Sequence, residues 1–238
     1  MTAIRVAAAA LVFTIGCATE PTESSLCERA TASLESCTGQ VPEDFRDACA
    51  ADPEKVAGAV LAEVDAETCV GAEHADGLAR SEFVGACSAL VNAAYWVVWL
   101  RSPSSQPLSP ALREKLRPWY GDLVDTVRVS WNSDLLSRWR VLGRDIIFDE
   151  DTDAQTFGNE IFVRYAPGTD NRLAALIGHE LGHAVQYRAH GGVSGFARAY
   201  CGAFYDSSFS YRQNALEVEA YNLQYRIKAC LDYGRDCP

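Results

Sequence analysis

The sequence predicts an α+β fold in which an all-α, disulfide-stapled module precedes a domain with a small mixed sheet. Apolar residues recur at helical spacing between residues 26 and 101. Short β-rich runs follow between residues 123 and 165. A helical segment then carries the pentapeptide HELGH, residues 179–183, and a later one carries Glu217. We therefore expect a small sheet beside two helices that supply functional side chains.

The chain divides into five predicted segments. The boundary between the two folded parts is the sequence SPSSQPLSP, in which three Pro and four Ser fall within nine residues. The predicted segments are a lipoprotein-type signal peptide (1–17), a tether (18–25), a Cys-rich helical module (26–101), a linker (102–110) and the mixed domain (111–238).

The first residues have the features of an export signal. A single basic residue, Arg5, precedes an apolar run over residues 6–16 that is too short to cross a membrane. The run ends at Gly16-Cys17, which resembles a bacterial lipobox, so we expect Cys17 to be lipidated and to anchor the chain to a membrane. The alternative is ordinary secretion, which leaves Cys17 in the mature chain. We therefore expect a lipoprotein of the outer membrane or cell surface, or, if Cys17 is not lipidated, a periplasmic or secreted protein.

Cysteine usage is consistent with export. The chain has nine Cys, and lipidation of Cys17 would leave eight, an even set that allows up to four disulfides. Five of the eight precede residue 100 and three follow residue 200, so full pairing needs at least one bridge between these regions. The net charge of -11 excludes nucleic acid as an expected partner, because such binding needs clustered Lys and Arg.

The helical module is predicted to contain four helices. Asp52 caps the third, and Pro53 occupies its first turn. The fourth is apolar enough to suggest a membrane span, but Ser88 and Asn92 interrupt it, so we expect a buried core helix. The predicted helices are a first one from Leu26 to the stop at Gly39, followed by 42–49, 54–64 and 82–100.

The mixed domain is predicted to begin with a helix and continue as strands. Thr169 or Asp170 caps the helix that carries the HELGH motif, and Gly191 ends it. The strand over residues 160–165, if it lies at a sheet edge, could pair with an extended peptide. The expected elements are helix 111–120, strands 123–131, 146–148 and 160–165, and the motif helix 171–189.

The HELGH motif carries the predicted chemistry. On a helix His179 and His183 share a face, so both imidazoles can bind one ion. Glu180 can reach a water on that ion and act as general base, which is the arrangement of zinc hydrolases. The alternative is a surface helix that carries two His by coincidence.

A catalytic zinc site needs a third protein ligand and one open position. The position six after His183 is Ala189, and His190 is out of register for a third His. The remaining source is a later helix, which offers Glu217 or Glu219. Glu217 shares a helix face with Tyr221, whereas Glu219 points elsewhere. The alternative for both carboxylates is a solvated helix face.

Residues from about 111 to 228 resemble the small zincin-like metallopeptidase domain often encoded beside bacterial extracellular contractile injection systems. The resemblance implies a Glu-type zincin in which Zn²⁺ is held by His179, His183 and Glu217, with Glu180 as catalytic base. Many related zincins have Asp where Tyr221 stands, and that Asp supports a ligand His. The matching segments are 112–121, 125–129, 158–163, HELGHAVQ (179–186) and YRQNALEVEAY (211–221).

The function expected from these features is zinc-dependent hydrolysis of peptide bonds in a peptide or protein substrate. A housekeeping protease and a toxin or effector protease share this chemistry. The alternative from another class is a non-catalytic, zinc-stabilised surface lipoprotein that binds a protein partner. The residue that stabilises the oxyanion is left open among His190, Tyr200, Tyr205 and Tyr211.

Overall fold

The computed structural model describes residues 23–39, 41–64, 77–102, 104–136, 139–146 and 152–238. Within them the chain is a mixed α+β protein, mostly helical with two small sheets. Cys17 and the predicted signal lie outside the described residues.

Four helices lie in the segment expected to be a helical module. Asp52 caps the third helix by accepting a hydrogen bond from the Lys55 backbone N–H. Gly39, with φ +75°, follows the first helix, which begins at Glu23, inside the segment expected to be a tether. The four helices are α1 (Glu23–Thr38), α2 (Glu43–Ala51), α3 (Pro53–Leu61) and α4 (Arg80–Arg101).

Helix α4 is the core helix of this module. By length and composition it could cross a membrane, but 67% of its most apolar 18-residue window is buried inside the structure. Its side chains join those of α1, α2 and α3 in one hydrophobic cluster, which continues into the sheet and the later helices through Phe157, Phe196 and Tyr200. This agrees with the expected buried helix.

The mixed part begins with α5 (Pro110–Tyr120), capped by the Ser109 side chain. A four-stranded sheet in the order β1-β2-β6-β5 follows, and only the β2–β6 pair is parallel. Its strands are β1 (Gln106–Pro107), β2 (Arg128–Trp131), β5 (Ala154–Phe157) and β6 (Glu160–Val163). A separate hairpin pairs β3 (Trp139–Val141) with β4 (Arg144–Ile146).

One of the strand predictions needs correction. The predicted strand 123–131 begins as a short helix, α6 (Leu123–Thr126), in which the Val127 N–H donates to the Leu123 carbonyl at 3.1 Å, so β2 starts only at Arg128. The predicted strand 160–165 forms as β6 between β2 and β5, so the condition for peptide pairing, a position at a sheet edge, is not met. Of the predicted strand 146–148, Ile146 lies in β4 and the rest lies outside the described residues.

Three long helices complete the chain. Asp170 caps α7 (Asn171–Ala189), which has the predicted bounds. Helix α8 (Val193–Asp206) had no predicted counterpart. After a short 3-10 turn, η2 (Tyr211–Gln213), Asn214 caps α9 (Ala215–Tyr233).

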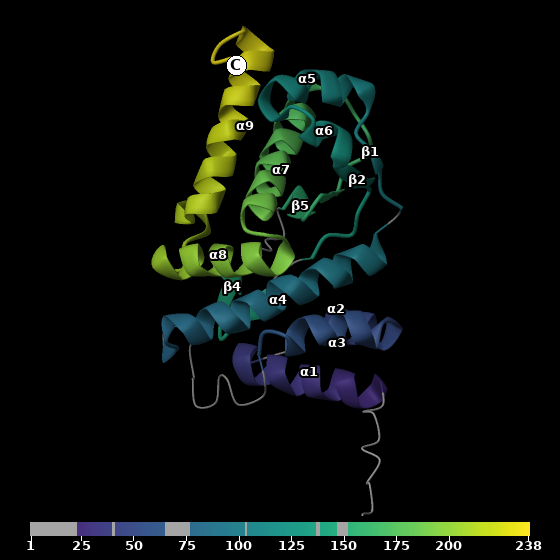
Figure 1. Ribbon diagram of the computed structural model, residues 1–238, viewed down its shortest axis with the longest axis vertical. Helices are drawn as coiled ribbons and strands as arrows, with labels where there is room; N and C mark the ends of the chain where they lie inside the picture. Colours follow the sequence, from purple (N-terminus) through teal and green to yellow (C-terminus); the bar gives the residue numbers. More distant parts are fainter. Residues whose placement is uncertain (1–22, 40, 65–76, 103, 137–138, 147–151) are drawn as a thin grey trace, which may run out of the picture.

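Helices α7 and α9 lie side by side (Figure 1), and glycines on α7 permit the close approach. A Cβ at Gly178 would lie 2.4 Å from Ile227 Cδ1, and one at Gly182 would lie 3.6 Å from the Ala220 backbone. Along the long axis of the molecule, α1, α4, α8 and the α7–α9 pair follow one another (Figure 1). The motif helix is therefore packed on α9, with α8 between it and the helical module.

Disulfides staple both parts of the chain. The described bridges are Cys27–Cys49, Cys87–Cys201 and Cys230–Cys237, and Cys37 is also disulfide-bonded. Cys87–Cys201 joins α4 to α8, which confirms the expected bridge between the early and late regions.

Candidate metal centre

The two motif histidines face each other on α7. Their Nε2 atoms lie 3.1 Å apart, as the four-residue spacing predicts for one helix face. Both side chains are buried, with 5% of His179 and 7% of His183 exposed. Two buried imidazoles that point at one position form the first half of a metal site.

Glu217, the third residue of α9, completes the cluster. Its Oε2 lies 3.5 Å from His179 Nε2, and its Oε1 lies 3.5 Å from His183 Nε2. Only 3% of Glu217 is exposed. The structure thus brings together the three predicted ligands in a buried His-His-Glu triad that could hold a metal ion.

The donor atoms fit a small divalent cation such as zinc. Zinc binds imidazole nitrogen and carboxylate oxygen at about 2.0–2.2 Å, so the ligand atoms of a tetrahedral site lie roughly 3.3–3.5 Å apart. The separations of 3.1 and 3.5 Å are close to these values. Moreover, Glu217 Oε2 is buried without a hydrogen-bond partner, and a bound cation would satisfy it.

The residues of the triad shift one another's pKa values. Burial is the largest single effect on His183 and lowers its pKa. The charge and hydrogen bonding of Glu217, together with the charge of Glu180 and the Gln186 contact, outweigh burial and raise this pKa to about 9. Burial alone raises the pKa of Glu217, but His183 and His179 lower it well below its usual range. Without a metal, the chain therefore favours a proton on His183 beside the Glu217 carboxylate.

Gln186 holds His183 from the side opposite the cluster. Its Oε1 lies 2.9 Å from His183 Nδ1, while its Nε2 donates to the Leu216 carbonyl at 3.0 Å and to Glu219 Oε2 at 2.9 Å. Because both of those partners only accept, the amide oxygen must face the imidazole. His183 Nδ1 therefore donates, and in the neutral ring the Nε2 lone pair points at the cluster.

His179 has no such support. Its Nδ1 is buried without a hydrogen-bond partner among the described residues, and its ring makes an edge-to-face contact with Tyr221, with the ring centroids 4.5 Å apart. The zincins that the sequence resembles often carry Asp at the position of Tyr221. An aromatic contact therefore stands where a carboxylate would otherwise accept from the imidazole.

Glu180 lies beside the ligands, on the sheet side of α7. Its Oε2 accepts a hydrogen bond of 2.6 Å from the hydroxyl of Thr156, in β5. Only 4% of Glu180 is exposed. The predicted general base is thus held by the edge strand.

The four residues considered for stabilising the oxyanion differ in how close they lie to the triad. The Tyr200 hydroxyl donates to Glu217 Oε1 at 3.0 Å, and burial, followed by the charge of Glu217, raises the pKa of Tyr200 well above its ordinary value. Tyr205 instead donates to the Leu78 carbonyl, and His190 is exposed at the end of α7. Tyr211 lies close enough to Glu217 for that charge, after burial, to raise its pKa.

Sequence reasoning missed the side chains that hold the site residues. Gln186 received no role beyond its place in the segment HELGHAVQ, and Thr156 was not considered. The signal for Gln186 was its position three residues after His183, on nearly the same helix face. No local signal pointed to Thr156, because its contact depends on the pairing of β5 with β6.

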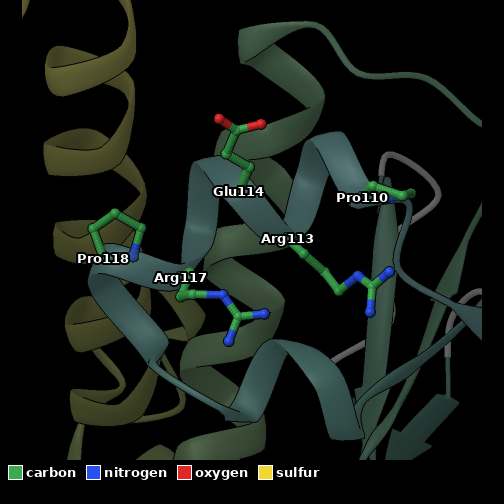
Figure 2. Close-up of a pocket in the computed structure, with 5 residues that line it drawn as sticks. All are labelled: Pro110, Arg113, Glu114, Arg117 and Pro118. Atoms are coloured by element: carbon green, nitrogen blue, oxygen red, sulfur yellow. The ribbon is translucent and has the colours of Figure 1, made fainter.

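A surface pocket on α5 has no lining residue in common with this centre. Figure 2 shows the residues that line it, which are Pro110, Arg113, Glu114, Arg117 and Pro118. Both arginines pair with Asp125, so neither guanidinium is a free anion-binding group.

Comparison with known proteins finds one family. No curated protein and no solved structure gives a significant match to the chain. Residues 107–191 match the family described as the eCIS core domain, which links the chain to extracellular contractile injection systems. This match includes α7 with HELGH and β5 with Thr156, and it ends before α8 and α9.

Proposed function

We propose that the protein is an exported zinc metallopeptidase that hydrolyses peptide bonds in peptide or protein substrates. The observation that carries this proposal is a buried triad of two imidazoles and one carboxylate with a second carboxylate, Glu180, beside it. Among the described residues the cluster has three members, which matches the three protein ligands of catalytic zinc sites.

In this proposal His179, His183 and Glu217 hold the zinc ion. When bound, zinc supplies Lewis acidity, which lowers the pKa of water and polarises a carbonyl group. Glu180 receives the proton of the attacking water and passes it to the leaving amine. The Thr156 hydroxyl fixes Glu180 Oε2, so Oε1 is the oxygen available for this proton.

The alternative is a non-catalytic lipoprotein that uses zinc for stability and binds a protein partner. A structural zinc site is normally closed by four protein ligands and needs no base. The buried Glu180 therefore favours the peptidase. The proposal extends to location: the disulfides and the link to injection systems fit an exported protein, and Cys17 is proposed as its lipid anchor.

The test compares the wild type with Glu180→Gln, both loaded with one equivalent of zinc, on β-casein as an unfolded substrate. We expect Glu180→Gln to retain zinc and to lose roughly 10²- to 10⁴-fold in cleavage rate, the usual contribution of a general base. Glu114→Gln, which changes an exposed carboxylate on α5, is the matched control and should cleave normally. New N-termini found by mass spectrometry identify the cleaved bonds. Equal cleavage by Glu180→Gln would exclude the assigned base.

A further inference from the structure

Tyr200 contacts the third ligand directly. Its side chain is 2% exposed, and its hydroxyl donates to Glu217 Oε1 at 3.0 Å. This leaves Oε2, the oxygen without a hydrogen-bond partner, free to bind a cation. The hydroxyl thus selects which oxygen of Glu217 can act as a ligand.

Tyr200 also acts on Glu217 through its backbone. Its carbonyl accepts a 3.2 Å hydrogen bond from Asn214 Nδ2. Asn214 is fully buried, and its Oδ1 accepts from the Leu216 N–H at 3.1 Å, which caps α9 three residues before Glu217. One residue therefore positions both the carboxylate and the helix end that presents it.

Helix α8, which carries Tyr200, is fastened to the helical module. The next residue, Cys201, is disulfide-bonded to Cys87 of α4. Arg198 forms an ion pair with the buried carboxylate of Glu63, at 2.9 Å. At the far end of α8, Asp206 forms a two-point ion pair with Arg80. These links connect α4 and Glu63 to the helix that carries Tyr200.

We propose that Tyr200 is a positioning residue of the metal centre, and that the Cys87–Cys201 bridge makes the helical module a structural part of that centre. The inference rests on the proposed function, because it concerns the same ligand set. It assigns a role to the module, which lies outside the family match at residues 107–191. Tyr200 acts here through Glu217 and is not itself a ligand.

The first test is Tyr200→Phe, which keeps the ring and removes the hydroxyl. Loss of such an outer hydrogen bond usually costs 10- to 100-fold in metal affinity, and we expect that range in a zinc titration against a chromophoric chelator. The Co²⁺ absorption bands should also shift, because the carboxylate can rotate. Tyr205→Phe, on the same helix but bonded to the Leu78 carbonyl, should change neither readout.

The second test removes bridges in pairs. Cys87→Ala with Cys201→Ala should weaken zinc binding at a temperature at which circular dichroism shows the variant folded. Cys27→Ala with Cys49→Ala, which removes a bridge between α1 and α2, should not. Equal zinc affinity in wild type and Tyr200→Phe would overturn the assignment of Tyr200. Equal affinity in the two paired Cys variants would overturn the role of the module. A wild type that binds no zinc would overturn the proposed function as well.

Discussion

The two histidines of the candidate metal centre have unlike surroundings. His183 donates to Gln186, which in turn donates to the Leu216 carbonyl and to Glu219, both on α9. His179 has a buried Nδ1 without a partner and rests against the Tyr221 ring. Metal-ligating histidines usually donate their second nitrogen to a carboxylate, carbonyl or water. The comparison indicates that hydrogen bonds orient one ligand and that packing orients the other.

This difference ranks the residues around the centre by their expected effect on metal binding. Residues on the His183 side fix the tautomer of this imidazole and connect α7 to α9, so replacing them should weaken metal binding. Residues on the His179 side provide ring contact alone, so modest changes there should be tolerated.

The largest effect is expected for Gln186→Leu. It leaves His183 Nδ1 without its partner and removes the bond from α7 to the Leu216 carbonyl, so zinc affinity should fall by about 10- to 100-fold. The unpaired buried imidazole nitrogen should also lower the free energy of unfolding by about 1–3 kcal/mol. Chelator competition and urea unfolding measure the two quantities. Gln213→Leu, at an exposed position of η2, is the control. Unchanged zinc affinity in Gln186→Leu would remove the difference between the two histidines.

The second effect concerns pH. The pKa of His183 is raised to about 9 by Glu217, so at pH 7 the metal-free chain holds a proton that zinc must displace. Zinc affinity should therefore fall by about tenfold per unit as pH drops below 9, and level off above it. Isothermal titration calorimetry in two buffers of different ionisation enthalpy counts the protons. We expect about one proton released from this site at pH 7 and fewer at pH 9.5. An equal count at both values would contradict the assignment.

A smaller effect is expected for Glu219→Gln. Glu219 is exposed and bonds Gln186 rather than the imidazole itself. Gln186 keeps its bond to the Leu216 carbonyl, so zinc affinity should fall only a few-fold, roughly 2- to 5-fold. A loss as large as that in Gln186→Leu would mean that the charge of Glu219, and not the amide, orients His183.

The smallest effect is expected for Tyr221→Phe. The ring that contacts His179 remains, so zinc affinity should stay within about twofold of the wild type. A tenfold loss would show that the Tyr221 hydroxyl supports the centre and that the His179 side is not held by packing alone.

Much of the site follows from local sequence. The bounds of α7 were predictable because Asp170 caps it and glycines follow it, and the four-residue spacing placed both histidines on one face. Glu217 required the family resemblance in addition to helical spacing, because Glu219 lies on the same helix.

The remainder depends on contacts that are distant in sequence. Helix α8 had a helical pattern in Phe196, Tyr200 and Phe204, at four-residue spacing, that was not recognised. Its contact with Glu217, however, depends on how α8 crosses α9 and on the bridge to Cys87, which no local pattern encodes. The central position of β6 likewise depends on the pairing of β2 and β5 with it.

The most direct test of the account is a crystal structure of the zinc-loaded protein with anomalous data collected at the zinc edge. The account predicts one anomalous peak within about 2.0–2.2 Å of His179 Nε2, His183 Nε2 and a Glu217 oxygen, with a water molecule in the fourth position. A peak elsewhere in the molecule, or a fourth protein ligand that closes the site, would contradict it.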